Sequence, residues 1–241
     1  MADPIHQFEI KELIPLELFE TNISFTNSSL FMSLSIISVI LLLLISIKNQ
    51  SLIPSRLQSI SEIFYEFIAN MISDNIGKKG HKFFPLIFTL FTFILFGNLL
   101  GMLPYSFTFT SHIIVTFAMA ITVFIGVTIL GLVKHGVHFF SFFVPPGVSI
   151  VLWPLMIPIE IISYLSRPIS LSVRLFANLT AGHTMLKVFA GFVVSMGIVG
   201  GILPFLFVIA LTGLELLIAF LQAYVFTILT CFYINDAMHL H

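Results

Sequence analysis

Residues 160–183, EIISYLSRPISLSVRLFANLTAGH, contain the feature around which the fold of this chain is built. The stretch lies inside a long apolar segment, yet it carries Glu160, Arg167, Arg174, Asn178 and His183. A charge at the centre of a membrane helix costs at least about 2.5–3.5 kcal/mol, and such residues usually face a bundle interior or an aqueous path. Arginine stays protonated at physiological pH. The stretch therefore predicts a membrane helix that keeps a permanent cation for a functional reason.

The composition agrees with a membrane protein. Of 241 residues, 58% are hydrophobic and 9% are charged, whereas soluble domains have about 25% charged residues. The apolar runs are long enough to cross a bilayer as helices of about 20 residues. We therefore expect an all-α polytopic membrane protein that forms a single membrane domain over residues 1–241.

The charge and the cysteine count exclude several kinds of site. The net charge of −1 gives no field that would attract nucleic acid. The single cysteine excludes an intrachain disulfide and any cysteine-rich metal site. His135 and His138 have the spacing of metal ligands, but no third ligand is evident. We expect neither a metal nor a cofactor.

The first part of the chain predicts a tail, a crossing and a surface helix. Residues 1–27 are polar and acidic, so we expect an outer tail with one short interfacial helix. Residues 28–47 form the first crossing. Residues 57–76 carry apolar side chains at three- and four-residue spacing opposite Glu62 and Glu66, which is typical of an amphipathic helix lying in the membrane interface. Its acidic face suggests a docking surface for a partner subunit.

Two pairs of helices follow. Residues 83–133 predict a helical hairpin, with Asn98 near its turn forming either an inter-helix hydrogen bond or part of a water-lined path. Residues 148–190 and 201–236 predict two longer helices with a turn near 191–200. Because each exceeds the roughly 30 Å of hydrocarbon, this second hairpin, 148–236, must be tilted, broken or curved. The total is about five membrane helices and one interfacial helix.

Basic residues set the expected orientation. Six of them lie in the connections after the first and third crossings: Lys48, Arg56, Lys78, Lys79, Lys82 and Lys134. The positive-inside rule places these connections in the cytoplasm or matrix. The N-terminus is then outside and the C-terminus inside.

An antiparallel hairpin with uniform rise brings polar residues of its two helices to matching heights. The predicted pairs are Glu160 with Asp236, Arg174 with Gln222, and His183 with Glu215. His183 is about half a turn out of phase with Arg174 and is expected to face away from it. These pairs are either structural ion pairs or the parts of a proton path that is blocked by the arginine. Arg167 is expected to be structural, either reaching the membrane surface or pairing with Glu160.

At these residues the sequence resembles subunit a of F-type ATP synthases. The matching stretches are PIEIISYLSRPISLSVRLFANLTAGH (158–183), GLELLIAFLQAYVFTILTCFYINDAMHLH (213–241) and MLPYSFTFTSHIIVTFA (102–118). The arrangement of histidine at 183 and glutamate at 215 resembles that in the mitochondrial and alphaproteobacterial members of this family.

The resemblance implies a proton-channel stator that works beside a rotating ring of small proteolipid subunits. It implies that Arg174 faces the ring between two half-channels, and that residues of both paths lie around it: Asn178, His183, Glu215 and Gln222 toward the outside, and Glu160 and Asp236 toward the inside. The further implied partners are a peripheral-stalk subunit, the rest of the ATP synthase and the lipid bilayer. Nucleotide chemistry would belong to partner subunits. The expected location is a bacterial inner membrane, with a mitochondrial inner membrane as the alternative.

Two other classes of membrane protein compete with this interpretation. A self-contained ion-coupled secondary transporter usually has internal repeats with paired broken helices, and no repeat is evident. An intramembrane hydrolase would need a catalytic motif, but neither HExxH nor GxSxG occurs.

Overall fold

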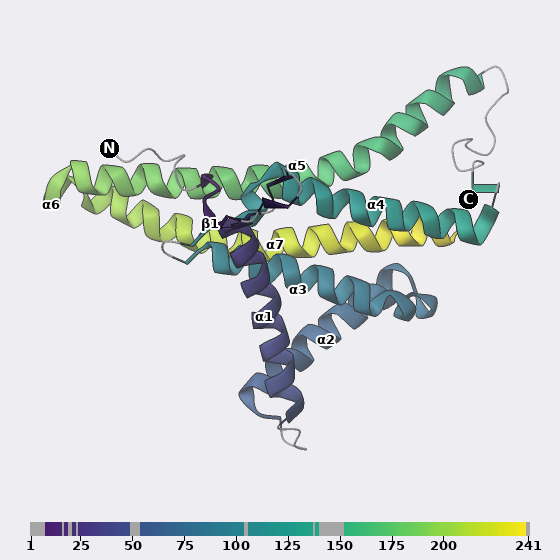
Figure 1. Cartoon of the computed structure of the whole chain (residues 1–241), viewed down its shortest axis with the longest axis horizontal. Coiled ribbons are helices and arrows are strands. Elements are labelled where there is room, and N and C mark those ends of the chain that lie inside the picture. Colours follow the sequence, from purple (N-terminus) through teal and green to yellow (C-terminus); the bar gives the residue numbers. More distant parts are fainter. Residues whose placement is uncertain are drawn as a thin grey trace.

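The computed structural model describes residues 8–15, 17–18, 21–22, 24–48, 54–103, 106–136, 138–139 and 152–239, with the backbone alone at 17–18, 21–22 and 198–199. Its helices are α1 (Asn27–Lys48), α2 (Arg56–Asn75), α3 (Phe84–Gly101), α4 (Ile113–His135), α5 (Trp153–Ser195), α6 (Gly197–Gly200) and α7 (Ile202–Met238), with 3-10 turns η2 (Lys78–Phe83) and η3 (Phe109–Ser111). Helices α3, α4, α5 and α7 run along a common direction, and α1 and α2 project from them (Figure 1).

The N-terminal tail forms short strands in its described residues. Strand β1 (Glu12–Ile14) pairs antiparallel with β4 (Phe25–Thr26), and β2 (Glu17–Leu18) pairs with β3 (Thr21–Asn22). The expectation of a short helix here is wrong for these residues. Asn27 explains the extended conformation, because its side chain accepts from the Lys11 amide at 3.2 Å and donates to the Glu9 carbonyl at 3.1 Å. These bonds hold the tail on the start of α1.

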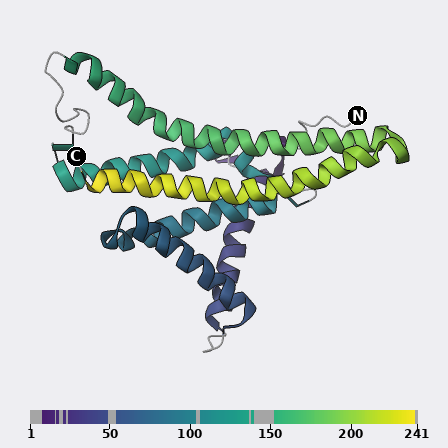
Figure 2. The same ribbon diagram turned by 180° about the vertical axis from the view of Figure 1, so that it is seen from behind.

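Within the described ranges, four helical segments are long and apolar enough to cross a membrane by length and composition: Asn27–Lys48, Lys78–Gly101, Ile113–His135 and Ile202–Met238. Helix α5 has 43 residues but is not among them, since Glu160, Arg167, Arg174 and Lys187 lower its hydropathy. It runs antiparallel to α7 over most of its length (Figure 2). The prediction of an all-α polytopic membrane protein is confirmed.

Helix α2 is amphipathic, as predicted, but much of its apolar face packs on protein. Ser55 caps its N-terminus by accepting from the Gln58 amide. Ile68 and Ile72 are fully buried, and the Phe67 ring lies 5.6 Å from that of Phe91 in α3, between centroids. The helix is therefore fixed against the bundle at its C-terminal half.

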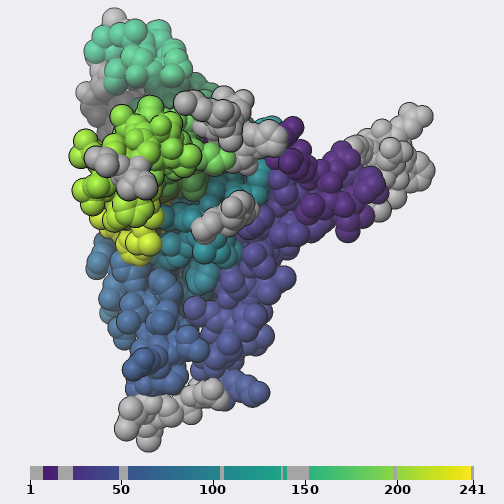
Figure 3. Space-filling view, turned by 90° about the vertical axis from the view of Figure 1, so that its left-hand side faces the viewer, coloured from purple at the N-terminus to yellow at the C-terminus, as the bar shows by residue number. Residues whose placement is uncertain are grey.

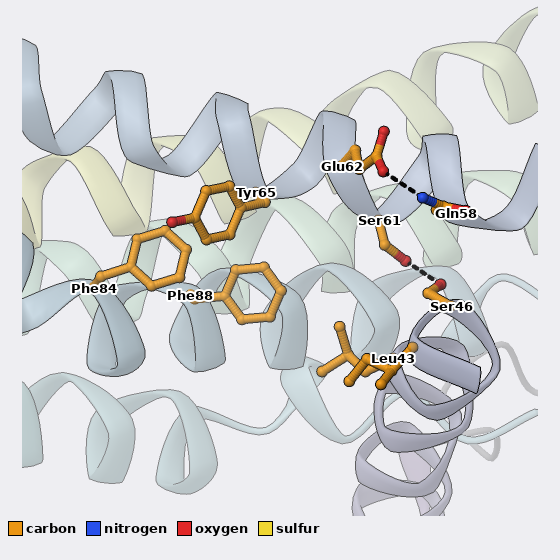
Figure 4. A pocket seen from close by; sticks show the side chains of 9 residues that line it. Leu43, Ser46, Gln58, Ser61, Glu62, Tyr65, Phe84 and Phe88 are labelled. Carbon is orange, nitrogen blue, oxygen red and sulfur yellow. Dashed lines mark hydrogen bonds between the residues drawn. The ribbon is translucent and has the colours of Figure 1, made fainter. Parts of the chain in front are cut away.

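A groove of about 370 Å³ opens where α1, α2 and α3 meet (Figure 4). Tyr65, Phe84 and Phe88 form its aromatic side. At its other end the hydroxyls of Ser46 and Ser61 are hydrogen-bonded at 2.6 Å, which joins α1 to α2. The V-shaped projection of these two helices is thus tied at its tip by polar contacts.

The long hairpin is formed by α5 and α7, of 43 and 37 residues. At 1.5 Å per residue they are about 65 and 55 Å long, which exceeds a hydrocarbon core of about 30 Å. The turn lies later than expected, because α5 continues through Gly191 to Ser195. Gly197 ends it, with φ of +70°, a conformation that favours glycine. The predicted residues 148–151 of this helix lie outside the described part of the chain.

The beginning of α5 diverges from α7. Both Figure 1 and Figure 2 show the beginning of α5 standing away from the end of α7, and in the space-filling view the same arm rises above the turn between α5 and α7 (Figure 3). Pro158 and Pro168 lie inside α5, and internal prolines remove helix hydrogen bonds and bend the helix. We call this region the open end of the hairpin, and the α6 region the turn end.

Candidate functional site

The turn end contains a buried acid–imidazole pair. His183 Nδ1 of α5 lies 3.0 Å from Glu215 Oε1 of α7, and the two side chains are 11% and 4% exposed. The predicted matching height of these residues is confirmed. The two atoms are within ion-pair distance, and neither carboxylate oxygen has another partner among the described residues. His183 is thus the group that offsets the charge of Glu215.

Small residues make room for this pair. A Cβ added to Gly182 would lie 3.0 Å from Glu215 Oε1, which is closer than nearly all real contacts of that kind. Glycine at 182 therefore lets the carboxylate approach the backbone of α5 beside His183.

A buried polar loop covers the other side of the imidazole. Thr108 and Phe109 are at most 5% exposed, although loops usually run over a protein surface. Thr108 Oγ1 lies 3.0 Å from His183 Nε2 and 3.1 Å from the carbonyl oxygen of Gly101. Sequence reasoning missed Thr108. The hydroxyl-rich run SFTFTS (106–111) directly after a membrane helix was the signal that could have indicated it.

Asn98 connects this loop to α7. Its Nδ2 donates to the Ala219 carbonyl at 3.1 Å, and its Oδ1 accepts from the Thr110 hydroxyl at 2.9 Å. The predicted inter-helix hydrogen bond of Asn98 is therefore confirmed. The Thr180 hydroxyl of α5 donates to the Ser111 carbonyl at 3.3 Å, so that the loop is fixed from both helices of the hairpin.

A second imidazole ends the loop. His112 stacks on Phe107, with ring centroids 5.1 Å apart. Burial lowers the pKa of His112, and its Nε2 has no hydrogen-bond partner among the described residues. This side chain is therefore a neutral packing group at the entrance to α4.

Arg174 and Asn178 lie on the opposite face of α5 from His183, as the phase of the helix predicted. Both are exposed, and a spacing of four residues places them one above the other. The other face is buried, with Leu175 and Leu179 at most 1% exposed. In the described part of the chain Arg174 makes no ion pair. Its predicted height beside the half-buried Gln222 is supported by no hydrogen bond and stays a prediction.

The open end contains a different pair. Arg167 Nη1 lies 3.0 Å from Asp236 Oδ2, and the two side chains are 21% and 39% exposed. The guanidinium carbon is 5.4 Å from the ring centroid of Tyr164 and 5.0 Å from that of Tyr233. Tyr164 is in turn hydrogen-bonded to Thr128 of α4 at 2.7 Å. Arg167 is thus held by a carboxylate and two aromatic rings.

One prediction at this end is wrong: Asp236 does not lie at the height of Glu160, because Arg167 binds it directly. Of the two alternatives for Arg167, pairing with Glu160 is not found, and reaching the membrane surface stays a prediction. The reason is that α5 bends away from α7, so that Glu160 moves off on the diverging arm and the long side chain of Arg167 reaches back across the gap. Glu160 is half-buried there and forms no ion pair with another described residue.

Known proteins resemble this chain over its whole length. The family model described as ATP synthase A chain matches residues 29–235. The chain belongs to this family.

Curated members of the ATP synthase A chain family agree with that assignment. An ATP synthase subunit a of Rhodospirillum rubrum is 57% identical over 241 residues, which cover all of both chains. One from Pelagibacter ubique is 58% identical over all of this chain and 99% of its own. One from Mesorhizobium japonicum is 56% identical over 99% of this chain and 97% of its own.

For a member of the ATP synthase A chain family, the structure separates the seven predicted site residues into groups. His183 and Glu215 are in contact, and Arg174 and Asn178 share an exposed face of α5. Asp236 is bound to Arg167, which is not one of the seven. Gln222 and Glu160 form no ion pair with the others. Within the described ranges no three His, Cys, Asp or Glu side chains gather as metal ligands do. Four of the seven residues have titratable side chains: His183, Glu215, Asp236 and Glu160.

Proposed function

We propose that this chain is the proton-translocating stator subunit of an ATP synthase membrane sector, in which two offset half-channels exchange protons with the carboxylates of a rotor ring. The family assignment supports the subunit. The separate grouping of titratable side chains at the two ends of the long hairpin supports the two paths.

The observation that carries the proposal is the exposed position of Arg174 without a described carboxylate partner. Arg174 is a permanent cation on the exposed face of α5, between the pair at the turn end and the pair at the open end, and no described carboxylate neutralises it. A cation in a membrane usually has a partner, so we infer that a carboxylate of the rotor ring supplies one.

Elementary electrostatics explains what Arg174 would do there. A cation about 4 Å from a carboxylate is worth about 4 kcal/mol at an effective dielectric of 20, and it commonly lowers the carboxylate pKa by about 1–3 units. A protonated ring site that approaches Arg174 therefore releases its proton to the open path. The same positive charge repels protons and prevents a direct leak between the paths.

The two paths use different acids. At the turn end, His183 and Glu215 relay protons, because the reference pKa of an imidazole lies near neutrality, with Asn178 and Gln222 between this pair and the ring. At the open end, Asp236 is engaged by Arg167, so Glu160 is the carboxylate better placed to exchange protons.

The membrane location of the chain, its orientation and a docking surface for a partner follow from the same proposal. The chain is a multi-pass membrane protein, and we place it in a bacterial inner membrane with its N-terminus outside and its C-terminus in the cytoplasm. Glu62 and Glu66 are exposed on α2, and their acidic face is the proposed docking surface for a peripheral-stalk subunit.

The test is to replace Arg174 in the assembled complex. Arg174→Ala is expected to abolish proton-driven ATP synthesis in liposomes while the amount of assembled complex stays near native. Arg174→Lys should remain severely impaired, since lysine keeps the charge but loses the planar fork of donors. Lys187→Gln, which removes another cation of α5, is the control and should retain most of the activity.

Native rates of synthesis in Arg174→Ala would contradict the proposal. So would gated proton flux through the purified chain alone in liposomes, because a self-contained transporter needs no rotor ring.

A further inference from the structure

The buried hydroxyl of Thr108 lies between two groups of unlike chemistry. Its oxygen is 3.1 Å from the Gly101 carbonyl, which can only accept, and 3.0 Å from His183 Nε2, which can donate or accept. A threonine has one hydroxyl hydrogen. Whichever neighbour receives this hydrogen decides which tautomer His183 adopts.

The position of the hydroxyl is set by the backbone of α3. Gly101 is the last residue of α3, where carbonyls lack a partner within the helix. A Cβ at 101 would lie 2.5 Å from Thr108 Oγ1, so the glycine allows the threonine to sit directly on the helix end. The Ser106 hydroxyl also reaches the Gly101 carbonyl, at 2.7 Å, but it has the Leu103 carbonyl at 2.6 Å as well.

The donors of the loop permit one simple arrangement. The Leu103 carbonyl accepts from the backbone amide of Ser106 at 3.1 Å, so it keeps a partner whichever carbonyl the Ser106 hydroxyl bonds. Thr108 can therefore donate to the Gly101 carbonyl and accept from Nε2–H of His183 with no carbonyl of the loop left unpaired.

The charge of the pair leads to the same tautomer. Glu215 is 4% exposed and has no described neighbour other than His183 to offset a negative charge, so the pair is most stable when its net charge is zero. That condition allows a neutral acid beside a neutral imidazole, or a carboxylate beside an imidazolium. In both states Nε2 carries a hydrogen if Nδ1 is the atom that exchanges a proton with Glu215.

We propose that Thr108 is a positioning residue for proton transfer at His183. Its hydroxyl donates to the Gly101 carbonyl and accepts from Nε2–H, which holds that hydrogen in place. The transferred proton then moves only between Glu215 Oε1 and Nδ1, the O–H bond breaking as the N–H bond forms. This inference rests on the proposed function of the chain and names the atom through which His183 acts in it.

The bond to Thr108 should also set the pH range of proton flux. An Nε2–H···O bond is stronger when the ring is a cation, so losing it disfavours the imidazolium. Among the described residues the titratable group against this ring is Glu215, whereas Arg174 and Lys187 of the same helix are exposed and His112 stacks on Phe107. These other groups are unchanged by a substitution at 108.

The test is ATP-driven proton pumping by the reconstituted complex as a function of pH. Thr108→Val should lower the flux near neutral pH about tenfold and shift the half-maximal pH about one unit downward. Thr108→Ser, which keeps the hydroxyl, should restore both. The matched control is Thr116→Val, because Thr116 is also fully buried but its hydroxyl bonds only carbonyls at the start of its own helix.

The inference is overturned if Thr108→Val pumps like the native complex, if its flux falls at an unchanged half-maximal pH, if Thr108→Ser fails to restore it, or if Thr116→Val shows the same shift. Should the Thr108→Val complex not assemble, Thr108→Cys, a poor acceptor of similar size, is measured with the same expectations. Native pumping in these preparations shows that the proposed function holds, so a failure at Thr108 alone is distinguishable from it.

Discussion

The two ends of the long hairpin each hold one pair of ionisable side chains across α5 and α7, but the pairs differ in kind. At the turn end both members can change protonation, and both are nearly buried. At the open end Arg167 cannot lose its proton, and the pair is partly exposed, at 21% and 39%. The same two helices thus carry one pair in which both members are titratable and one in which Arg167 is a permanent cation.

This difference shows that spacing alone does not identify a proton carrier. Both pairs come from polar residues at regular intervals on two antiparallel helices. The neighbours of the two pairs differ. His183 contacts the Thr108 hydroxyl, which also bonds the Gly101 carbonyl. Arg167 contacts two tyrosine rings. The first environment suits proton exchange, and the second holds a cation in place.

The largest effect should follow from breaking the turn-end pair. His183→Ala and Glu215→Gln should each lower proton flux about a hundredfold, the size expected when a general acid or base is lost, while the complex still assembles. Combining His183→Gln with Glu215→Gln removes both charges but should not restore flux, since no titratable group remains. Proton pumping and the amount of assembled complex are measured together. Equal loss of the complex in all variants would assign this pair to structure instead.

The open-end pair should behave in the opposite way in a double-mutant cycle. Asp236→Asn removes the carboxylate that Arg167 binds, so the thermal stability of the complex should fall by a few degrees, equivalent to about 1–2 kcal/mol for partly exposed groups. Arg167→Gln together with Asp236→Asn should recover most of that loss. If the double variant is no more stable than the single one, the pair contributes little, and Asp236 acts through another contact.

The smallest effect is expected at Thr128, whose hydroxyl bonds Tyr164, one of the two rings that contact Arg167. Thr128→Val removes the hydrogen bond to Tyr164, which should cost about 1 kcal/mol and leave proton flux unchanged. Thr122→Val is the matched control, because Thr122 is in the same helix and its hydroxyl donates to the Ala118 carbonyl. A marked loss of flux in Thr128→Val alone would mean that the open-end pair takes part in proton transfer.

Much of the fold could be predicted from the sequence, because hydrophobic length and periodicity fix membrane helices strongly. The crossings, the amphipathic α2 and the antiparallel hairpin follow from such patterns, and so does the contact of His183 with Glu215. The opposite faces of His183 and Arg174 follow from helical phase alone.

The parts that could not be predicted depend on departures from regular geometry. The heights assigned to Glu160 and Asp236 assumed straight helices, and the divergence of α5 near its prolines removed that match. The strands of the tail depend on contacts made by Asn27 that no local pattern encodes. Thr108 was missed because a threonine beside a turn is common, and only the fold brings it to His183.

The burial of residues 107–111 has a practical consequence for probing this protein. Connections between membrane helices are the usual places for epitope tags, spin labels and cross-linkers, because most tolerate insertion. Here an insertion would push apart α3, α5 and the acid–imidazole pair at once. The exposed connection at Ser195 and Met196 is a safer site for a reporter that must not disturb the path under study.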